Sequence, residues 1–155
     1  MARAFIIGYG NPLRGDDSLG WHAARLLAGL APVHGAEVLT RHQLMPELAE
    51  PVSEAATVIF VDAASEGAPG LLRWRRVEPQ PGPASFTHHL SPEALLGMAM
   101  ELYGRCPRAF AVSIAGGDFT CGEELSPAVR AALPALVGLV EKLLSGAMTE
   151  SAGGE

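Results

Sequence analysis

The chain has 155 residues and a formal net charge of -6, and 48% of its residues are hydrophobic and 18% charged. A chain of this length fits one domain, and burial of its apolar side chains can offset the entropy lost when the backbone is ordered. Apart from residues 73–76, the Lys and Arg residues are scattered, which excludes the continuous basic surface that nucleic-acid binding requires.

The N-terminal segment lacks the features of a signal peptide or a membrane span. Its apolar run meets Gly8 after fewer residues than either of these needs. We therefore expect a cytoplasmic protein with no membrane partner. We also expect one domain over residues 1–145, followed by a disordered tail of small residues over 146–155.

Hydrophobic patterning predicts alternating strands and helices along the chain. Short apolar runs predict buried strands at residues 5–8, 37–40, 58–61 and 109–114. Apolar residues at helical spacing, with Ser-Pro start signals at 91 and 126, predict helices at residues 18–30, 46–53, 91–102 and 126–143. Residues 71–77 alternate apolar and basic side chains, as an exposed edge strand does.

This order of elements predicts an α/β three-layer sandwich, in which helices flank a mostly parallel, twisted sheet of about five strands. In such sheets, ligands bind beyond the carboxyl ends of the strands. Polar side chains fall there in three groups, which are Asn11, Asp16 and Asp17 after the first strand, Asp62 after the third, and His88 and His89 before the helix at 91–102.

Carboxylates together with an imidazole suit a divalent cation. Asp62 directly follows an apolar strand, so its carboxylate needs a partner to offset desolvation. The alternative for Asp16 and Asp17 is that one of them caps the following helix or lies in its first turn. The alternative for His88 and His89 is that they are ordinary loop residues at a helix start, and we expect at most one to bind a metal.

A glycine-rich turn after the first strand also raises the possibility of a dinucleotide site. Gly8 and Gly10 match the start of that fingerprint, but its third glycine is replaced by Leu13. The adjacent Asp16 and Asp17 would repel a pyrophosphate. The pattern therefore favours a cation over a nucleotide.

Residues 8–20, G-Y-G-N-P-L-R-G-D-D-S-L-G, closely resemble the N-terminal signature of the hydrogenase maturation endopeptidases, roughly G-x-G-N-x-L-x-x-D-D/E-x-x-G. Residues 59–64 are similar to the I-x-V-D-A segment of that family, and residues 86–92 to its histidine segment. The order and separation of these segments agree from residue 4 to about residue 144.

The resemblance implies an endopeptidase that removes the C-terminal extension of a nickel-loaded NiFe-hydrogenase large-subunit precursor. It implies that Asp17, Asp62 and His88 bind the nickel, which arrives with the substrate, and that these residues carry catalysis. His88 is preferred to His89 because it directly follows the threonine of the family's histidine segment. We assign substrate contact to Asn11, Asp16 and His89.

One loop departs from the family pattern. Many members have an acidic D-G-G-T segment after the second strand, whereas residues 40–48 here read T-R-H-Q-L-M-P-E-L. We expect His42 and Gln43 to contact the substrate in place of the missing acid. The residues alone leave one alternative function open, a non-catalytic metal- or ligand-binding α/β module such as a nickel chaperone.

Overall fold

The computed structural model describes residues 3–80 and 90–146. Its centre is a five-stranded sheet with the strand order β2-β1-β3-β5-β4. The strands are β1 (Ala4–Tyr9), β2 (Ala36–Arg41), β3 (Thr57–Ala64), β4 (Leu72–Val77) and β5 (Arg108–Ala115). All neighbouring strands are parallel except β4, which pairs antiparallel with β5 and forms an edge, as its alternating sequence predicts.

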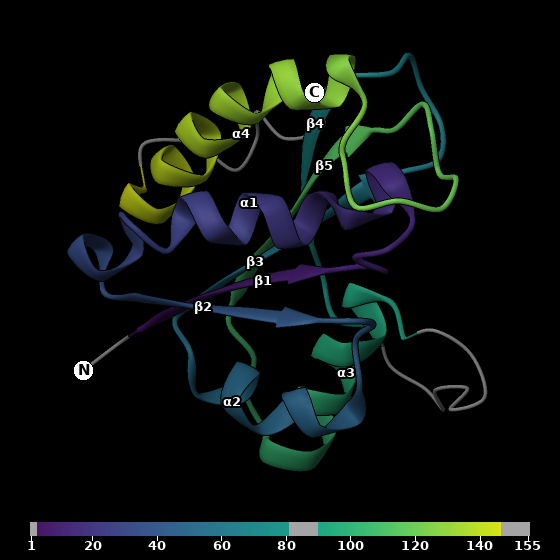
Figure 1. Ribbon diagram of the computed structural model, residues 1–155. Helices are drawn as coiled ribbons and strands as arrows, with labels where there is room; N and C mark the ends of the chain where they lie inside the picture. Colours follow the sequence, from purple (N-terminus) through teal and green to yellow (C-terminus); the bar gives the residue numbers. More distant parts are fainter. Residues whose placement is uncertain (1–2, 81–89, 147–155) are drawn as a thin grey trace.

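Helices cover both faces of this sheet, with α1 and α4 on one face and α2 and α3 on the other (Figure 1). The helices are α1 (Leu19–Leu27), α2 (Ala49–Glu54), α3 (Pro92–Tyr103) and α4 (Pro127–Ser145), and the 3-10 turns are η1 (Gly15–Ser18), η2 (Ala31–His34) and η3 (Pro46–Leu48). No helix in the described part of the chain is long and apolar enough to cross a bilayer. The layers confirm the predicted α/β sandwich.

Alternate residues of each central strand enter two separate cores. In β3, Ile59 and Val61 pack toward α1 and α4, whereas Val58 and Phe60 pack toward α2 and α3. This is why β3 has a continuous apolar run instead of an alternating one, since both faces of a parallel strand are buried. The next residue on the α2 and α3 face is Asp62.

Several boundaries differ from the predicted ones. The first helix begins with the 3-10 turn η1, the segment at 46–53 is divided between η3 and α2, and β3 continues to Ala64. Asp62 therefore lies inside β3, because Asp62, Ala63 and Ala64 still pair with Ser113–Ala115 of β5. Of the predicted tail, the residues after Gly146 lie outside the described part of the chain.

The glycines of the segment 8–20 allow β1 to contact α1 closely. A Cβ atom on Gly8 would lie 2.2 Å from the carbonyl oxygen of Gly20. A Cβ atom on Gly20 would lie 2.5 Å from the backbone nitrogen of Tyr9 and 2.8 Å from the carbonyl oxygen of Val61. Because these neighbours are backbone atoms, they cannot move aside as a side chain could.

We expect Gly20→Ala to destabilise the fold by about 1–3 kcal/mol, the usual cost of overpacking, measured by chemical denaturation. Gly138→Ala in α4 is the matched control, because a Cβ atom there would have no neighbour within 4 Å. That control should gain about 0.5–1 kcal/mol, as Gly to Ala in a helix interior does. Equal effects of the two substitutions would contradict the close approach of β1 and α1.

Candidate functional site

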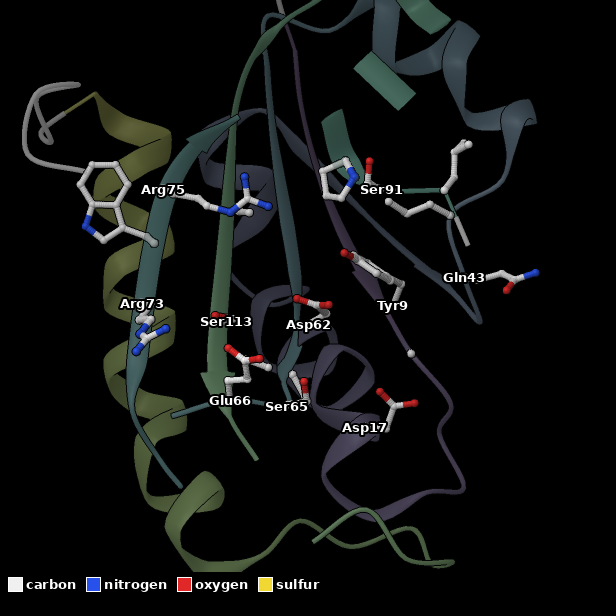
Figure 2. Close-up of a pocket in the computed structure, with 18 of the residues that line it drawn as sticks. Tyr9, Asp17, Gln43, Asp62, Ser65, Glu66, Arg73, Arg75, Ser91 and Ser113 are labelled. Atoms are coloured by element: carbon white, nitrogen blue, oxygen red, sulfur yellow. The ribbon is translucent and has the colours of Figure 1, made fainter. Parts of the chain in front are cut away.

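A cavity of about 820 Å³ opens at the carboxyl end of the parallel strands. This is where ligand sites form in α/β sheets. Its described lining comes from the ends of β1, β2, β3 and β5, from β4, and from the start of α3 (Figure 2). The polar residues among that lining are Tyr9, Asp17, His42, Gln43, Asp62, Ser65, Glu66, Arg73, Arg75, Ser91 and Ser113.

The floor of the cavity is a row of side chains that crosses the sheet. Asp62 of β3 is in register with Ser113 of β5, and Ser113 is in register with Arg73 of β4. On the other side, Gly8 pairs with Val61, which brings the next residue, Tyr9, beside Asp62. Paired residues point to the same face of a sheet, so these four side chains share the face covered by α2 and α3.

One end of the row is acidic. The hydroxyl of Tyr9 faces the carboxylate of Asp62 and stabilises its charged form, whereas the charge of Asp17 disfavours it. Burial raises the pKa of Asp62 to about 7, and the charge of Asp17 adds to this rise, while Tyr9 and Arg75 partly oppose it. Asp62 is thus held in a place where its negative charge lacks full compensation, which favours an incoming cation.

The backbone around β1 fixes the position of Asp17. Its Oδ2 accepts a hydrogen bond of 2.8 Å from the backbone N–H of Asn11. The intervening chain turns through Gly10, which has a φ of 138° and lies so close to Asp17 that a Cβ atom would be 2.2 Å from its carbonyl oxygen. Trp21 holds the turn by donating its indole N–H to the carbonyl of Gly10 over 2.8 Å.

Asp16 points away from the cavity and is fully buried. Its carboxylate accepts hydrogen bonds from the backbone N–H groups of Gly117, Asp118 and Ser126 and from the Ser126 hydroxyl, at 2.7–3.0 Å. Burial alone would raise the pKa of Asp16, but these hydrogen bonds outweigh burial and hold the pKa below its ordinary value. Asp16 therefore joins η1 to the loop between β5 and α4.

The alternative for these two acids is wrong in one part, since neither η1 nor α1 has a side-chain cap hydrogen bond. Its other part is confirmed, because both acids lie in the first turn of η1. Asn11 also has a local role, because its Oδ1 accepts a hydrogen bond from the backbone N–H of Leu13. Among the described residues, neither Asn11 nor Asp16 lines the cavity, and their contact with substrate stays a prediction.

The remaining predicted site residues fall on two loops. His42 and Gln43, directly after β2, are exposed and line the cavity. His88 and His89 lie outside the described residues, and Leu90, the first described residue after them, lines the cavity. Within residues 3–80 and 90–146, no group of three or more His, Cys, Asp or Glu side chains is placed to hold a metal ion.

The other end of the cavity is basic, and we did not predict this from the sequence. Arg73 and Arg75 of β4 both line it (Figure 2). Arg75 forms an ion pair with Glu93 in the first turn of α3. The alternation of residues 71–77 contained a signal, because the buried Trp74 fixes one face of the strand and so turns both arginines toward the other face.

Neither protein-family models nor curated proteins match the sequence. The structure, however, is similar to solved structures over nearly its whole length. The hydrogenase maturating endopeptidase HybD from Escherichia coli has 24% identity and a TM-score of 0.72, with 94% of this chain and 93% of that chain covered. The NiFe hydrogenase maturation protease HycI from Thermococcus kodakarensis has 25% identity and a TM-score of 0.71, with 93% of each chain covered.

A hydrogenase 2 maturation peptidase from a Thaumarchaeota archaeon has 25% identity and a TM-score of 0.69, with 92% of this chain and 98% of that chain covered. These likenesses confirm the predicted fold class. They also agree with the family that residues 8–20 resemble, which was inferred from the sequence independently of the structure.

Proposed function

We propose that this chain, a member of the hydrogenase maturation endopeptidase family by its fold and its motifs, removes the C-terminal extension of a nickel-loaded NiFe-hydrogenase large-subunit precursor. The observation that carries the proposal is the pair of carboxylates, Asp17 and Asp62, that face one cavity at the carboxyl end of the sheet. We propose that the reaction takes place in the cytoplasm.

The two carboxylates are suited to recognise a divalent cation that enters with a protein substrate. They belong to different elements, η1 and β3, and the charge of Asp17 disfavours ionisation of Asp62. A cation bound between them would remove this repulsion. Because oxygen donors alone bind nickel weakly, ligands from the precursor would complete the coordination, and nickel-free precursor would bind poorly.

His88 is the third nickel ligand in this proposal. It is separated from the cavity-lining Leu90 by a single residue. An imidazole would add the nitrogen donor that suits nickel better than a third carboxylate. His89 is the competing position, so His88→Ala and His89→Ala should be compared side by side, with loss of cleavage expected only for the first.

The chemistry follows from the position of the ion in the substrate. Nickel held by the precursor and by Asp17 and Asp62 would polarise the scissile carbonyl or an adjacent water molecule, so that water attacks the peptide bond directly. No covalent intermediate with the enzyme is required. The role of this chain is then to place a particular peptide bond beside the ion and to cleave only after nickel has been inserted.

Cleavage should depend on the nickel carried by the substrate. Purified protein is mixed with nickel-loaded or nickel-free precursor, and loss of the C-terminal extension is followed by mass spectrometry. We expect cleavage of the loaded form only, and a loss of at least about 100-fold in Asp17→Ala, since a missing ligand removes both recognition and positioning. Arg25→Gln, an exposed change on α1 outside the cavity, should cleave as wild type does.

Equal cleavage of the two precursors, or full activity of Asp17→Ala, would overturn the proposal. The alternative of a nickel chaperone predicts a stoichiometric complex with an unshortened partner. The same mass spectra would show that outcome directly, because the mass of the precursor would not change.

A further inference from the structure

We propose that Arg73 and Ser113 bind an acidic side chain of the substrate peptide. This side chain lies about three residues along the peptide from the substrate residue that is nearest to Asp62. This inference rests on the proposed function for the identity of the peptide. It adds a second recognition point, at the basic end of the cavity, to the nickel-binding end.

The register of the sheet places the two recognition points on one line. Asp62 pairs with Ser113, and Ser113 pairs with Arg73, so the three side chains project from adjacent strands on the same face. Figure 2 shows Asp17, Tyr9 and Asp62 toward one side of the cavity and Arg73 and Arg75 toward the other. A peptide lying across the strands would therefore meet the acidic end and the basic end in succession.

The distance between these points sets the spacing in the substrate. Strands lie about 4.8 Å apart, so two steps across the sheet from Asp62 to Arg73 cover about 10 Å. An extended peptide rises about 3.3 Å per residue, so about three residues span the same distance. The cavity, at about 820 Å³, has room for such a segment.

The two arginines differ in their availability. Arg75 is already paired with Glu93 of α3. Arg73 lines the cavity, but no carboxylate oxygen in the described part of the chain lies within 4.0 Å of its guanidinium nitrogens, the distance of an ion pair. Arg73 can therefore bind a carboxylate of the substrate through its guanidinium. The adjacent Ser113 hydroxyl can donate a hydrogen bond to the same carboxylate.

One negative side chain of the cavity opposes this binding. Glu66, on the loop after β3, is exposed and lines the cavity. The guanidinium of Arg73 is close to the same loop, since a Cβ atom on Gly67 would lie 3.6 Å from Nη2 of Arg73. Glu66 should therefore weaken the binding of an acidic substrate group, and its removal should act in the direction opposite to removal of Arg73.

Steady-state cleavage of nickel-loaded precursor provides the first test. We expect Arg73→Gln to raise KM about 10-fold with kcat within about 2-fold of wild type, because a binding contact is lost while the scissile bond stays at the acidic end. Glu66→Gln should lower KM, Arg73→Lys should fall between wild type and Arg73→Gln, and Arg25→Gln should have no effect.

The substrate side is tested by changing each Asp or Glu within five residues of the cleavage point to its amide. One of these changes should raise KM in wild type but not in Arg73→Gln, which identifies the partner by a double-mutant cycle. If every acidic position behaves alike in the two enzymes, or if no acidic residue lies in this window, the inference is wrong.

Peptide binding tests the inference without cleavage. The full chain, labelled with nitrogen-15, is titrated with acetyl-Ala-Asp-Ala-amide or with acetyl-Ala-Asn-Ala-amide. Only the Asp peptide, and not the Asn peptide, should shift the Nε–Hε resonance of Arg73 and the backbone amide resonance of Ser113. In Arg73→Gln, the Asp peptide should no longer shift the Ser113 resonance. Absence of these shifts overturns the inference even if nickel-dependent cleavage is found, whereas shifts without any cleavage would overturn only the proposed function.

Discussion

Asp16→Ala should destabilise the folded protein by about 3–5 kcal/mol, the usual cost of breaking a buried charged network. The buried carboxylate accepts four hydrogen bonds from Gly117, Asp118 and Ser126. Alanine would leave these donors without the acceptor that they have in the folded protein. The melting temperature should fall by roughly 10 °C or more, measured by calorimetry.

The effect of Asp16 should also depend on pH. The pKa of this carboxyl is lower in the folded protein than its ordinary value of 3.8, so the folded state prefers the ionised form. Its stabilising contribution is therefore complete at neutral pH and is lost as the pH falls below about 4. The difference between wild type and Asp16→Ala should shrink over that range.

Asp118→Asn is the control for Asp16→Ala in the same loop. The side chain of Asp118 accepts hydrogen bonds from Thr120 and is exposed, while its backbone N–H, which donates to Asp16, is unchanged by the substitution. This variant should melt close to wild type. If Asp16→Ala melts at the same temperature as Asp118→Asn, the network does not support the fold in the way described.

The sequence predicted the α/β layers because their signals are local. Continuous apolar runs marked the strands, and Ser-Pro pairs marked the starts of α3 and α4, where Ser91 accepts the capping hydrogen bond from Ala94 over 3.1 Å. The start of α1 was less accurate, because η1 is held by tertiary contacts. Gly15 and Asp16 donate backbone hydrogen bonds to Gly122 and Asp118, more than 100 residues away.

The same distinction explains the site. The position of Asp62 beyond an apolar run was visible in the sequence, and so were the acids after β1. The separate roles of Asp16 and Asp17 were not, because adjacent acids differ only in which distant segment each one meets. Arg73 was missed for a related reason, since its place in the row with Asp62 depends on the pairing of β3, β5 and β4.

Asp62→Asn should stabilise the protein at pH 8 while it abolishes cleavage. The pKa of Asp62 is raised from 3.8 to about 7 in the folded protein, mainly by burial and further by Asp17. The folded state thus keeps a proton that the unfolded chain releases above about pH 4. As the pH rises from 4 to 7, this group makes the folded state progressively less stable, by roughly 2–4 kcal/mol in total.

Asparagine has nearly the same shape but carries no charge at any pH, so the variant does not lose this stability. The difference in unfolding free energy between Asp62→Asn and wild type, measured by urea denaturation, should be small at pH 4 and grow until about pH 7. Tyr9→Phe should act in the opposite direction at pH 8, because it removes the hydroxyl that lowers the pKa of Asp62 and leaves the carboxylate with less compensation.

The two effects of Asp62→Asn separate function from stability. In nickel-loaded precursor assays, we expect cleavage to fall by at least about 100-fold, since an amide binds a divalent cation far less strongly than a carboxylate does. A variant that is more stable and yet inactive cannot owe its inactivity to unfolding. If the variant cleaves normally, Asp62 does not bind the cation. If the variant is less stable than wild type at pH 8, the charge of Asp62 is balanced within the fold.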